Sequence, residues 1–267
     1  MIGTRSAVLA LGLTGGLLMP APRVPPPLTA RYHVATQTVT IVDLSVFGQP
    51  SQEIRVAVDA WVSLSLADTA GGRLVHLVVD SLRYQGTQPQ LTQEMADSAR
   101  GGTVHGFLAP DGRVRDLKPT PESNIFMGEM PALVHALFPR IRPGSRPGDG
   151  WSDTLEVANT AAGANVLTRS LIRYTMAAPG MTGGSPATRL EAQSQVAVRG
   201  TIQSPQAGAM ELEGQGTSAD TLYVNVSDGL LGGSSSTLKL TQAVRMAMAP
   251  APIPIVVTAG MVITRLP

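Results

Sequence analysis

One stretch of the chain, EIRVAVDAWVSLSLAD at residues 53–68, alternates between apolar and polar side chains over an unusual length. Its even positions from Ile54 to Leu66 are all apolar, while most odd positions are polar and Trp61 interrupts the polar series. Successive side chains of a strand point to opposite faces, so this period of two predicts one strand with an apolar and a polar face. The alternation over residues 54–66 is about twice as long as a usual strand. Such a strand favours a strongly curved sheet or a barrel.

The same alternation recurs along the chain. Residues 73–84 follow the first strand through a turn at Gly71 and Gly72, and residues 188–200 and 236–248 repeat the pattern. Turns rich in glycine or proline separate these segments, which is typical of a meandering antiparallel β protein. We predict further strands at residues 31–43, 103–108, 113–117, 151–157, 165–176, 207–213, 219–227 and 253–265.

Two segments break the alternation and favour helices. Residues 91–100 contain good helix formers and end at Gly101, which suits a left-handed helix cap. Residues 130–139 place Pro131 early, where its missing N–H costs nothing, and stop at Pro139. The predicted fold class is therefore mainly β: a single curved antiparallel sheet or half-barrel of long strands, with two short helical segments inserted near the middle.

The apolar faces of the predicted strands need a cover, because a large contiguous apolar patch is unusual on a soluble monomer. The second helical segment, with the residues just before it, is apolar but too small to cover several long strands. Either the sheet curls onto itself, or a second sheet packs on it, or a cavity remains for an apolar ligand. We predict six residues of this segment as contacts of such a ligand: Ile125, Phe126, Leu133, Val134, Leu137 and Phe138.

The first 30 residues predict an exported chain. Arg5 precedes an uncharged, largely apolar run at residues 7–19, which has about the length of the apolar part of an export signal. The proline cluster at residues 20–27 then favours a stiff linker over a continuing helix. We therefore predict a signal peptide and proline-rich linker at residues 1–30, a single antiparallel β domain at residues 31–267, and a periplasmic or extracellular location. An uncut leader that anchors the chain is the open alternative.

The composition argues against disulfides and against nucleic acid as a partner. The chain has no cysteine, so an exported protein of this kind relies on its core alone and cannot carry a cysteine-linked lipid. Without Arg5 and Arg23 of the leader, 18 of the 20 basic residues remain against 19 acidic ones, which gives a net charge of −1. This balance, with aromatic residues at only 4%, does not suit a nucleic-acid surface.

The stretch PGDGWSDTLEV at residues 147–157 looks most like a site, because Asp149 and Asp153 bracket one of only two tryptophans. Calcium loops need carboxylates and carbonyls at several close positions and a terminal glutamate, and this stretch lacks that set. Glycines flank Asp149, whereas alternation begins at Trp151. The stretch therefore predicts a turn that enters a strand, and we predict no metal site and no cofactor.

No set of residues predicts catalysis. Ser236 and Lys239 have the spacing of serine acyl enzymes that use a lysine, but that geometry needs a helix and the alternation here predicts a strand. The four histidines, His33, His76, His105 and His135, fall on different elements and show no zinc-site spacing. We therefore expect a protein that is not an enzyme.

Arginines at positions 140, 142 and 146 follow the second helical segment. This cluster would suit an anionic headgroup or an envelope protein partner, and a solvated loop is the alternative.

The layout resembles the periplasmic lipoprotein-carrier (LolA/LolB-like) type. There, a curved half-barrel of long antiparallel strands holds acyl chains, and helices close its mouth. Stretches such as Pro110 to Val114 and Pro147 to Trp151 are also similar to parts of uncharacterised secreted bacterial proteins. The resemblance covers residues 31–265 and implies a lipid-like ligand, but the lipid-attachment cysteine of LolB-like members is missing, so no functional residue is carried over.

Three hypotheses follow from the sequence. The first is an exported, non-enzymatic binding protein whose sheet holds an apolar or lipid-like ligand beneath the helix at residues 125–138. The second is an envelope structural or interaction protein without a small ligand. The third is a small outer-membrane barrel, which the low aromatic content disfavours because such barrels carry aromatic girdles.

Overall fold

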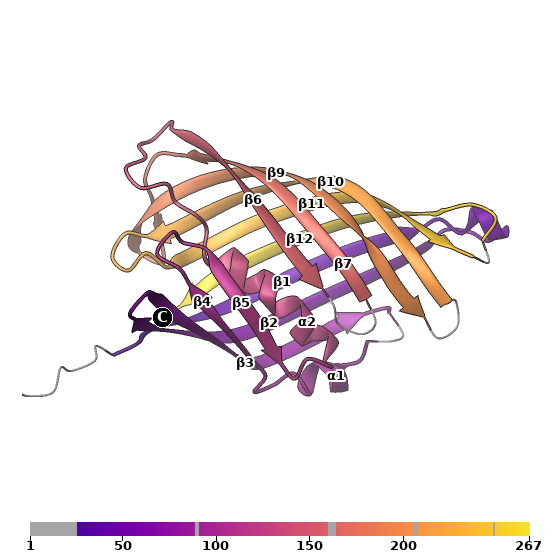
Figure 1. Ribbon diagram of the computed structural model, residues 1–267, viewed down its shortest axis with the longest axis horizontal. Coiled ribbons are helices and arrows are strands. Elements are labelled where there is room, and N and C mark those ends of the chain that lie inside the picture. The colour runs from indigo at the N-terminus through magenta and orange to yellow at the C-terminus, as the bar shows by residue number, and fades with distance from the viewer. Residues whose placement is uncertain (1–25, 89–90, 160–163, 205–207, 248) are drawn as a thin grey trace, which may run out of the picture.

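A computed structural model describes residues 26–88, 91–159, 164–204, 208–247 and 249–267. These residues form one antiparallel sheet that curls into a half-barrel around a helix (Figure 1). The predicted fold class is confirmed, including the long strands and the two short helices near the middle. The predicted signal peptide and linker span residues 1–30, of which residues 1–25 lie outside the described residues, while β1 begins at Leu28.

Twelve strands, two α-helices and one short 3₁₀ helix make up the described part of the chain. In chain order they are β1 (Leu28–Val42), η1 (Ser45–Phe47), β2 (Gln52–Thr69), β3 (Gly72–Gly86), α1 (Gln93–Asp97), β4 (Thr103–Leu108), β5 (Val114–Thr120), α2 (Ile125–Leu137), β6 (Gly150–Asn159), β7 (Ala164–Met176), β8 (Gly180–Thr182), β9 (Ser185–Ser204), β10 (Gly208–Asn225), β11 (Leu231–Met246) and β12 (Ile253–Leu266).

The strand order leaves two edges open. It runs β5-β4-β3-β2-β1-β12-β11-β10-β9-β7-β6, with the short β8 paired to β9 off this path. Within the described residues no ladder joins β5 to β6, so the sheet does not close into a barrel. Helix α2 connects β5 to β6 in the chain and contacts both strands in space (Figure 1). We call the line where α2 lies between these two edges the seam.

The pairing register defines an inner face, which carries α2, and an outer face. One row of the inner face runs across five strands through Tyr174, Ala192, Asp220, Ser236 and Met261. We call these five residues the inner row. The even positions of β2 point to the same face, as the alternation predicted, and the most buried of them join the core around α2. Polar residues alternate onto the outer face.

Helix α2 fills one end of the half-barrel. Its buried side chains are Phe126, Met127, Met130, Leu133, Val134 and Leu137, and all of them belong to the main hydrophobic core. The Asn124 side chain caps the helix by accepting hydrogen bonds from the N–H groups of Phe126 (2.9 Å) and Met127 (3.3 Å). The same side chain donates to the carbonyl oxygen of Met95 (3.1 Å) in α1. One cap residue therefore fixes both helices to each other.

The second helix contains Pro131 in its interior and not in its first turn. The span of residues 130–139, based on the prolines, starts too late, whereas the wider span of residues 125–138 agrees with a helix that begins at Ile125. A proline inside a helix removes one backbone hydrogen bond, which lowers helix stability in isolation. Packing of the long apolar side in the core compensates, because tertiary contacts supply most helix stability in proteins.

The predicted break between strands at residues 207–213 and 219–227 is wrong, because β10 runs without interruption from Gly208 to Asn225. The glycines of its GQG stretch, Gly214 and Gly216, lie on the inner face where the sheet curls tightly. A Cβ on Gly214 would meet the Thr241 carbonyl oxygen at 2.9 Å, and one on Gly216 would overlap the Lys239 carbonyl oxygen. These glycines therefore permit close strand approach and do not form a turn.

Substitution of Gly216 tests this role. Gly216→Ala should lower the free energy of unfolding by about 1–3 kcal/mol, because the new Cβ forces the β10–β11 ladder apart. Gly260→Ala on β12 is the matched control, since its Cβ would meet nothing closer than the Ser236 carbonyl oxygen at 3.9 Å. Urea denaturation of both variants checks the difference, and equal stabilities would contradict the steric role of Gly216.

Candidate functional site

A cavity of about 150 Å³ lies between α2 and the inner face of the sheet. We call it the inner cavity. Its sheet side includes the whole inner row, from five strands, together with Leu155 of β6. It is lined by Ala132, His135, Ala136, Pro139, Leu155, Ile172, Tyr174, Ala192, Asp220, Leu222, Ser234, Ser236 and Met261. The lining is mostly apolar, and Asp220, Ser234 and Ser236 form a polar group on the neighbouring strands β10 and β11.

The six predicted ligand contacts lie mainly on the other side of α2. Phe126, Leu133, Val134 and Leu137 are buried in the core, and Ile125 packs against that core from a half-buried position. Phe138 also packs on the core and lines a second cavity. None of the six lines the inner cavity, where α2 presents the small residues Ala132 and Ala136 together with His135. A charge introduced at Leu137 would therefore test the fold and not binding.

The wall of the inner cavity near β6 is rigidly held. The rings of Trp151 and Tyr174 stack with centroids 5.5 Å apart. The Trp151 indole N–H donates to the Arg140 carbonyl oxygen at 3.1 Å. The Arg140 guanidinium in turn pairs with the Asp153 carboxylate. Together these contacts fix one side of the cavity and neutralise both charges there.

Burial raises the pKa of Tyr174 to about 12, and the nearby carboxylates of Asp153 and Asp220 act in the same direction. Tyr174 is therefore neutral at ordinary pH. It offers the cavity a phenol and an aromatic wall but no charge.

Asp220 is the charged group of the inner row. It is half-buried, and the Ser218 hydroxyl donates to its carboxylate at 3.2 Å, while Ser236 supplies another side-chain hydrogen bond. Burial raises the pKa of Asp220 although both serine hydrogen bonds oppose that shift. Among the residues that the structure describes, no cation forms an ion pair with Asp220. A carboxylate in an apolar site without a cation is costly.

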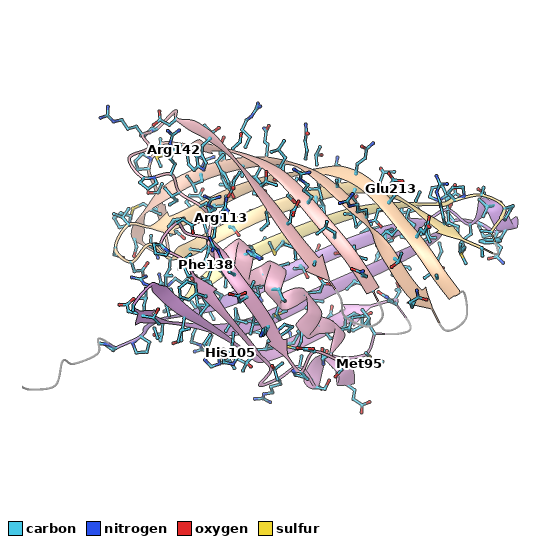
Figure 2. The ribbon with its side chains drawn as sticks, viewed as in Figure 1. Met95, His105, Arg113, Phe138, Arg142 and Glu213 are labelled. Carbon is cyan, nitrogen blue, oxygen red and sulfur yellow. The ribbon has the colours of Figure 1, made fainter. Side chains whose placement is uncertain are left out.

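A second cavity, of about 300 Å³, lies at the seam between β5 and β6. We call it the seam cavity. It includes Arg113, from the turn before β5, and Phe138, from the end of α2, which lie close together in Figure 2. It shares His135, Leu155, Ile172 and Tyr174 with the inner cavity, so the two cavities lie next to each other on one side of α2. Burial lowers the pKa of His135, so this shared residue is mostly neutral at pH 7.

The inner face beyond α2 is partly covered by its own curl. Val196, Val198 and Leu240 form a small buried cluster, against which Val166, Leu212, Leu238 and Val257 pack. Of the three ways predicted to cover the apolar faces, the structure therefore uses two: the sheet curls onto itself, and a cavity remains beside α2.

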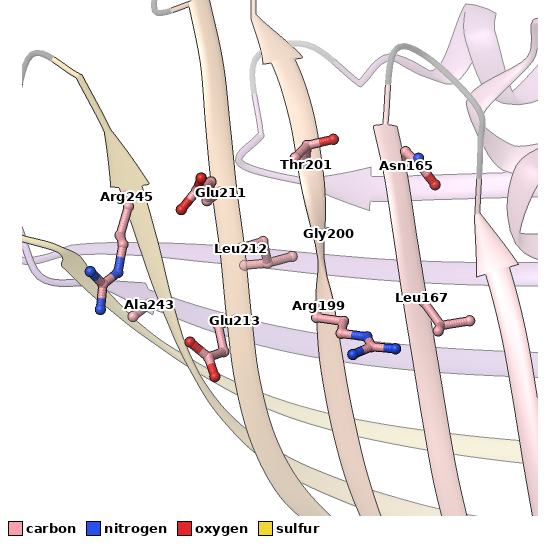
Figure 3. A pocket seen from close by; sticks show the side chains of 10 residues that line it. All are labelled: Asn165, Leu167, Arg199, Gly200, Thr201, Glu211, Leu212, Glu213, Ala243 and Arg245. Carbon is pink, nitrogen blue, oxygen red and sulfur yellow. The ribbon is translucent and has the colours of Figure 1, made fainter.

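A third hollow, of about 500 Å³, lies over β7, β9, β10 and β11 and is shown in Figure 3. Its charged residues are cross-strand neighbours of opposite sign on the outer face, Arg199 with Glu213 and Arg245 with Glu211. These charges balance each other and are solvated, so this hollow is an ordinary charged surface.

The structure brings together histidines that sequence spacing could not connect. His76 and His105 are cross-strand partners on β3 and β4, and their rings stack 4.5 Å apart. Parallel stacked rings do not direct their nitrogens at a shared point, so this pair is a poor chelator. His33 stacks on Trp61 and hydrogen-bonds to Asp59 at 2.9 Å. No group of three or more potential metal ligands occurs among the described residues.

Two motif predictions are confirmed. Asp149 lies in a turn, where its carboxylate accepts a hydrogen bond from the Arg146 N–H at 2.8 Å, and β6 begins at Gly150. Ser236 and Lys239 lie on opposite faces of β11, so they cannot act as a pair. Neither α1 nor α2 is both long and apolar enough to cross a membrane, and the same holds for any other helical segment in the described ranges.

Comparisons with known proteins give little further information. No protein-family model matches the chain, and no curated protein matches it. A solved structure described as lipid–protein interactions in lipovitellin is similar with a TM-score of 0.47 and 9% sequence identity. The match covers 92% of this chain but only 26% of that one, so the chain spans about a quarter of its length. A likeness of this degree carries no information on function.

The pH dependence of stability tests the environment of Asp220. Because its pKa is raised, the folded protein binds this proton more tightly than the unfolded chain, and stability falls as the pH rises through the folded pKa. Asp220→Asn cannot ionise and loses this decline. The stability of the variant relative to the wild type should therefore increase from pH 4 to pH 7.

Urea unfolding of both proteins across this pH range measures the difference. Glu213→Gln removes an acid from the outer face of the same strand and is the control, which should not show this increase. If the stability difference between Asp220→Asn and the wild type did not change with pH, Asp220 would not be held in an unfavourable site.

Proposed function

We propose that this protein is an exported, non-enzymatic binding protein that holds an apolar or lipid-like ligand between α2 and the inner face of the sheet. The observation that carries the proposal is the inner cavity, which lies where α2 presents alanines to the sheet and leaves space. The cavity is lined mainly by apolar side chains from five strands, and the seam cavity adjoins it.

Burial of hydrocarbon can supply the binding energy without a special polar motif. Each CH₂ group transferred from water contributes about 0.8 kcal/mol. An acyl or alkyl chain of moderate length therefore binds an apolar trough with useful affinity, even after the cost of association is subtracted. This explains why the sequence carries no recognisable binding signature.

The seam provides an access route for such a ligand. Within the described residues no ladder joins the edges β5 and β6, and the seam cavity lies between them. Four residues line both cavities, and the proposed route from the seam to the inner row follows this shared wall. A ligand can then enter from the side without unpairing any strand.

The second candidate, an envelope interaction protein without a small ligand, is favoured by the outer face. Large apolar side chains are exposed there, and two of them, Ile41 on β1 and Val256 on β12, are cross-strand neighbours. This small patch would suit contact with another protein. The test below separates the two candidates, because only the first requires a ligand in the cavity.

Native mass spectrometry of protein purified from its own envelope, followed by solvent extraction, tests the ligand directly. The expected result is a lipid or other apolar molecule recovered in near-stoichiometric amount. A bare chain that also fails to take up the uncharged fluorescent reporter N-phenyl-1-naphthylamine would overturn the proposal in favour of the interaction protein.

A tryptophan in the inner cavity should block uptake of the reporter. Ala136→Trp fills the space between α2 and the inner row, so the concentration for half-maximal uptake should rise at least about tenfold, which corresponds to about 1.4 kcal/mol. Ala219→Trp is the matched control, because Ala219 precedes Asp220 on β10 and lies exposed on the outer face. Equal uptake by both variants and the wild type would place the reporter elsewhere.

The mature N-terminus should lie before Leu28. Strand β1 starts at Leu28, and Ala30 is buried in the core, so cleavage after Ala30 would remove the first three residues of a central strand. Intact-mass measurement of protein recovered from the periplasm or medium checks this expectation. Protein found only in the cytoplasm would contradict export, and a start after Ala30 would contradict the cleavage argument.

A further inference from the structure

We propose that Asp220, with Ser218 and Ser236, binds the ammonium head of an amphiphile whose apolar tail lies on the inner face of the sheet. The inference rests on the proposed binding function and names the class of ligand: a single-chain amphiphile with a protonated primary amine. Asp220 lines the inner cavity from the middle of the inner row, between Ala192 on β9 and Ser236 on β11.

The charge balance of the cavity favours a cation. His135 from α2 is mostly neutral at pH 7, and Tyr174 from β7 is neutral. Asp153 from β6 is already paired with Arg140. The other sheet neighbours of Asp220, including Met261 from β12, carry no charge. The cavity therefore holds one carboxyl group without a cationic partner, that of Asp220, and an ammonium group would complement its ionised form.

The hydrogen-bond geometry leaves acceptor capacity for a head group. The two serine hydroxyls occupy part of the carboxylate, with Ser218 at 3.2 Å from one oxygen. An ionised carboxylate offers about four acceptor positions, so at least one further donor can bind. An ammonium group supplies three donors and no acceptor, which also matches the hydroxyl oxygens of the serines.

The surroundings of Asp220 suit an apolar tail. The next row of the inner face, away from α2, consists of Ile172, Ser194, Ser218, Leu238 and Ala259. The row beyond it places the buried Val196 and Leu240 on either side of Gly216, so apolar surface begins one row away from Asp220. Along β10, the six residue steps from Asp220 to Gly214 span about 20 Å at about 3.4 Å per step. A polar head at Asp220 thus has an apolar floor on the side toward the curl of the sheet.

A series of three probes with one chain length isolates the head group. Dodecylammonium chloride, 1-dodecanol and sodium dodecanoate, each below its micelle concentration, are titrated against N-phenyl-1-naphthylamine bound to the full-length protein at pH 7. We expect dodecylammonium to displace the reporter at a concentration at least about tenfold lower than dodecanoate, with dodecanol between them. Equal displacement by all three, or preference for dodecanoate, overturns the inference while the proposed function stands. Failure of the reporter and all probes to bind overturns the proposed function itself.

Two variants test whether Asp220 causes the preference for dodecylammonium over dodecanoate. In Asp220→Asn the concentrations of dodecanoate and dodecylammonium that displace half of the reporter should become about equal. Glu213→Gln removes the same charge from the outer face of the same strand and should keep the wild-type ratio. Persistence of the preference in Asp220→Asn would overturn the assignment of the head-group site.

A pH titration of the wild type gives a test that does not depend on the folding of the Asp220 variant. Protonation of Asp220 at low pH should weaken dodecylammonium binding by at least fivefold and leave dodecanol binding unchanged. His135 also gains charge as the pH falls, so the titration is repeated on His135→Gln. If Asp220 binds the head group, dodecylammonium binding by His135→Gln should still weaken at low pH. If it no longer weakens, the effect belongs to His135 and the inference is overturned.

Discussion

The packing of α2 between two unpaired sheet edges is the contact on which the rest of the structure depends. One side of the helix is long and apolar and joins the main core, while the other side is built from alanines and a histidine. Burial of each large side chain of this kind contributes about 1.5–3 kcal/mol. The helix thus stabilises a sheet that hydrogen bonds do not close, and its small residues leave room beside the inner row.

Much of the fold is predictable because a period of two is visible within a single strand. Alternation over β2 and β9 identified both strands and the face that each turns inward. The same reasoning failed at the GQG stretch of β10, since glycine signals both a turn and a place where strands approach closely. Only the three-dimensional position of Gly214 and Gly216, opposite the backbone of β11, separates these two meanings.

The residues that line the inner cavity were harder to predict from the sequence, for a physical reason. The inner row takes its members from five strands, and Tyr174 and Met261 are far apart in sequence, so no local pattern marks them. The predicted contacts in α2 were selected for apolar bulk, which identifies the side of a helix that packs in a core. A wall of a cavity is marked instead by small residues such as Ala132 and Ala136, and these carry no sequence signal of their own.

The pairing of β1 with β12 has a consequence for how the chain folds. These strands are neighbours in the middle of the sheet, with Arg31 opposite Leu266, although almost the whole described chain separates them. Contacts of such high sequence separation slow folding, because a long loop must close before they form. The central pair of the sheet therefore cannot assemble until the last strand has emerged. This delay keeps the central strands unpaired for longer than strands that are neighbours in the sequence.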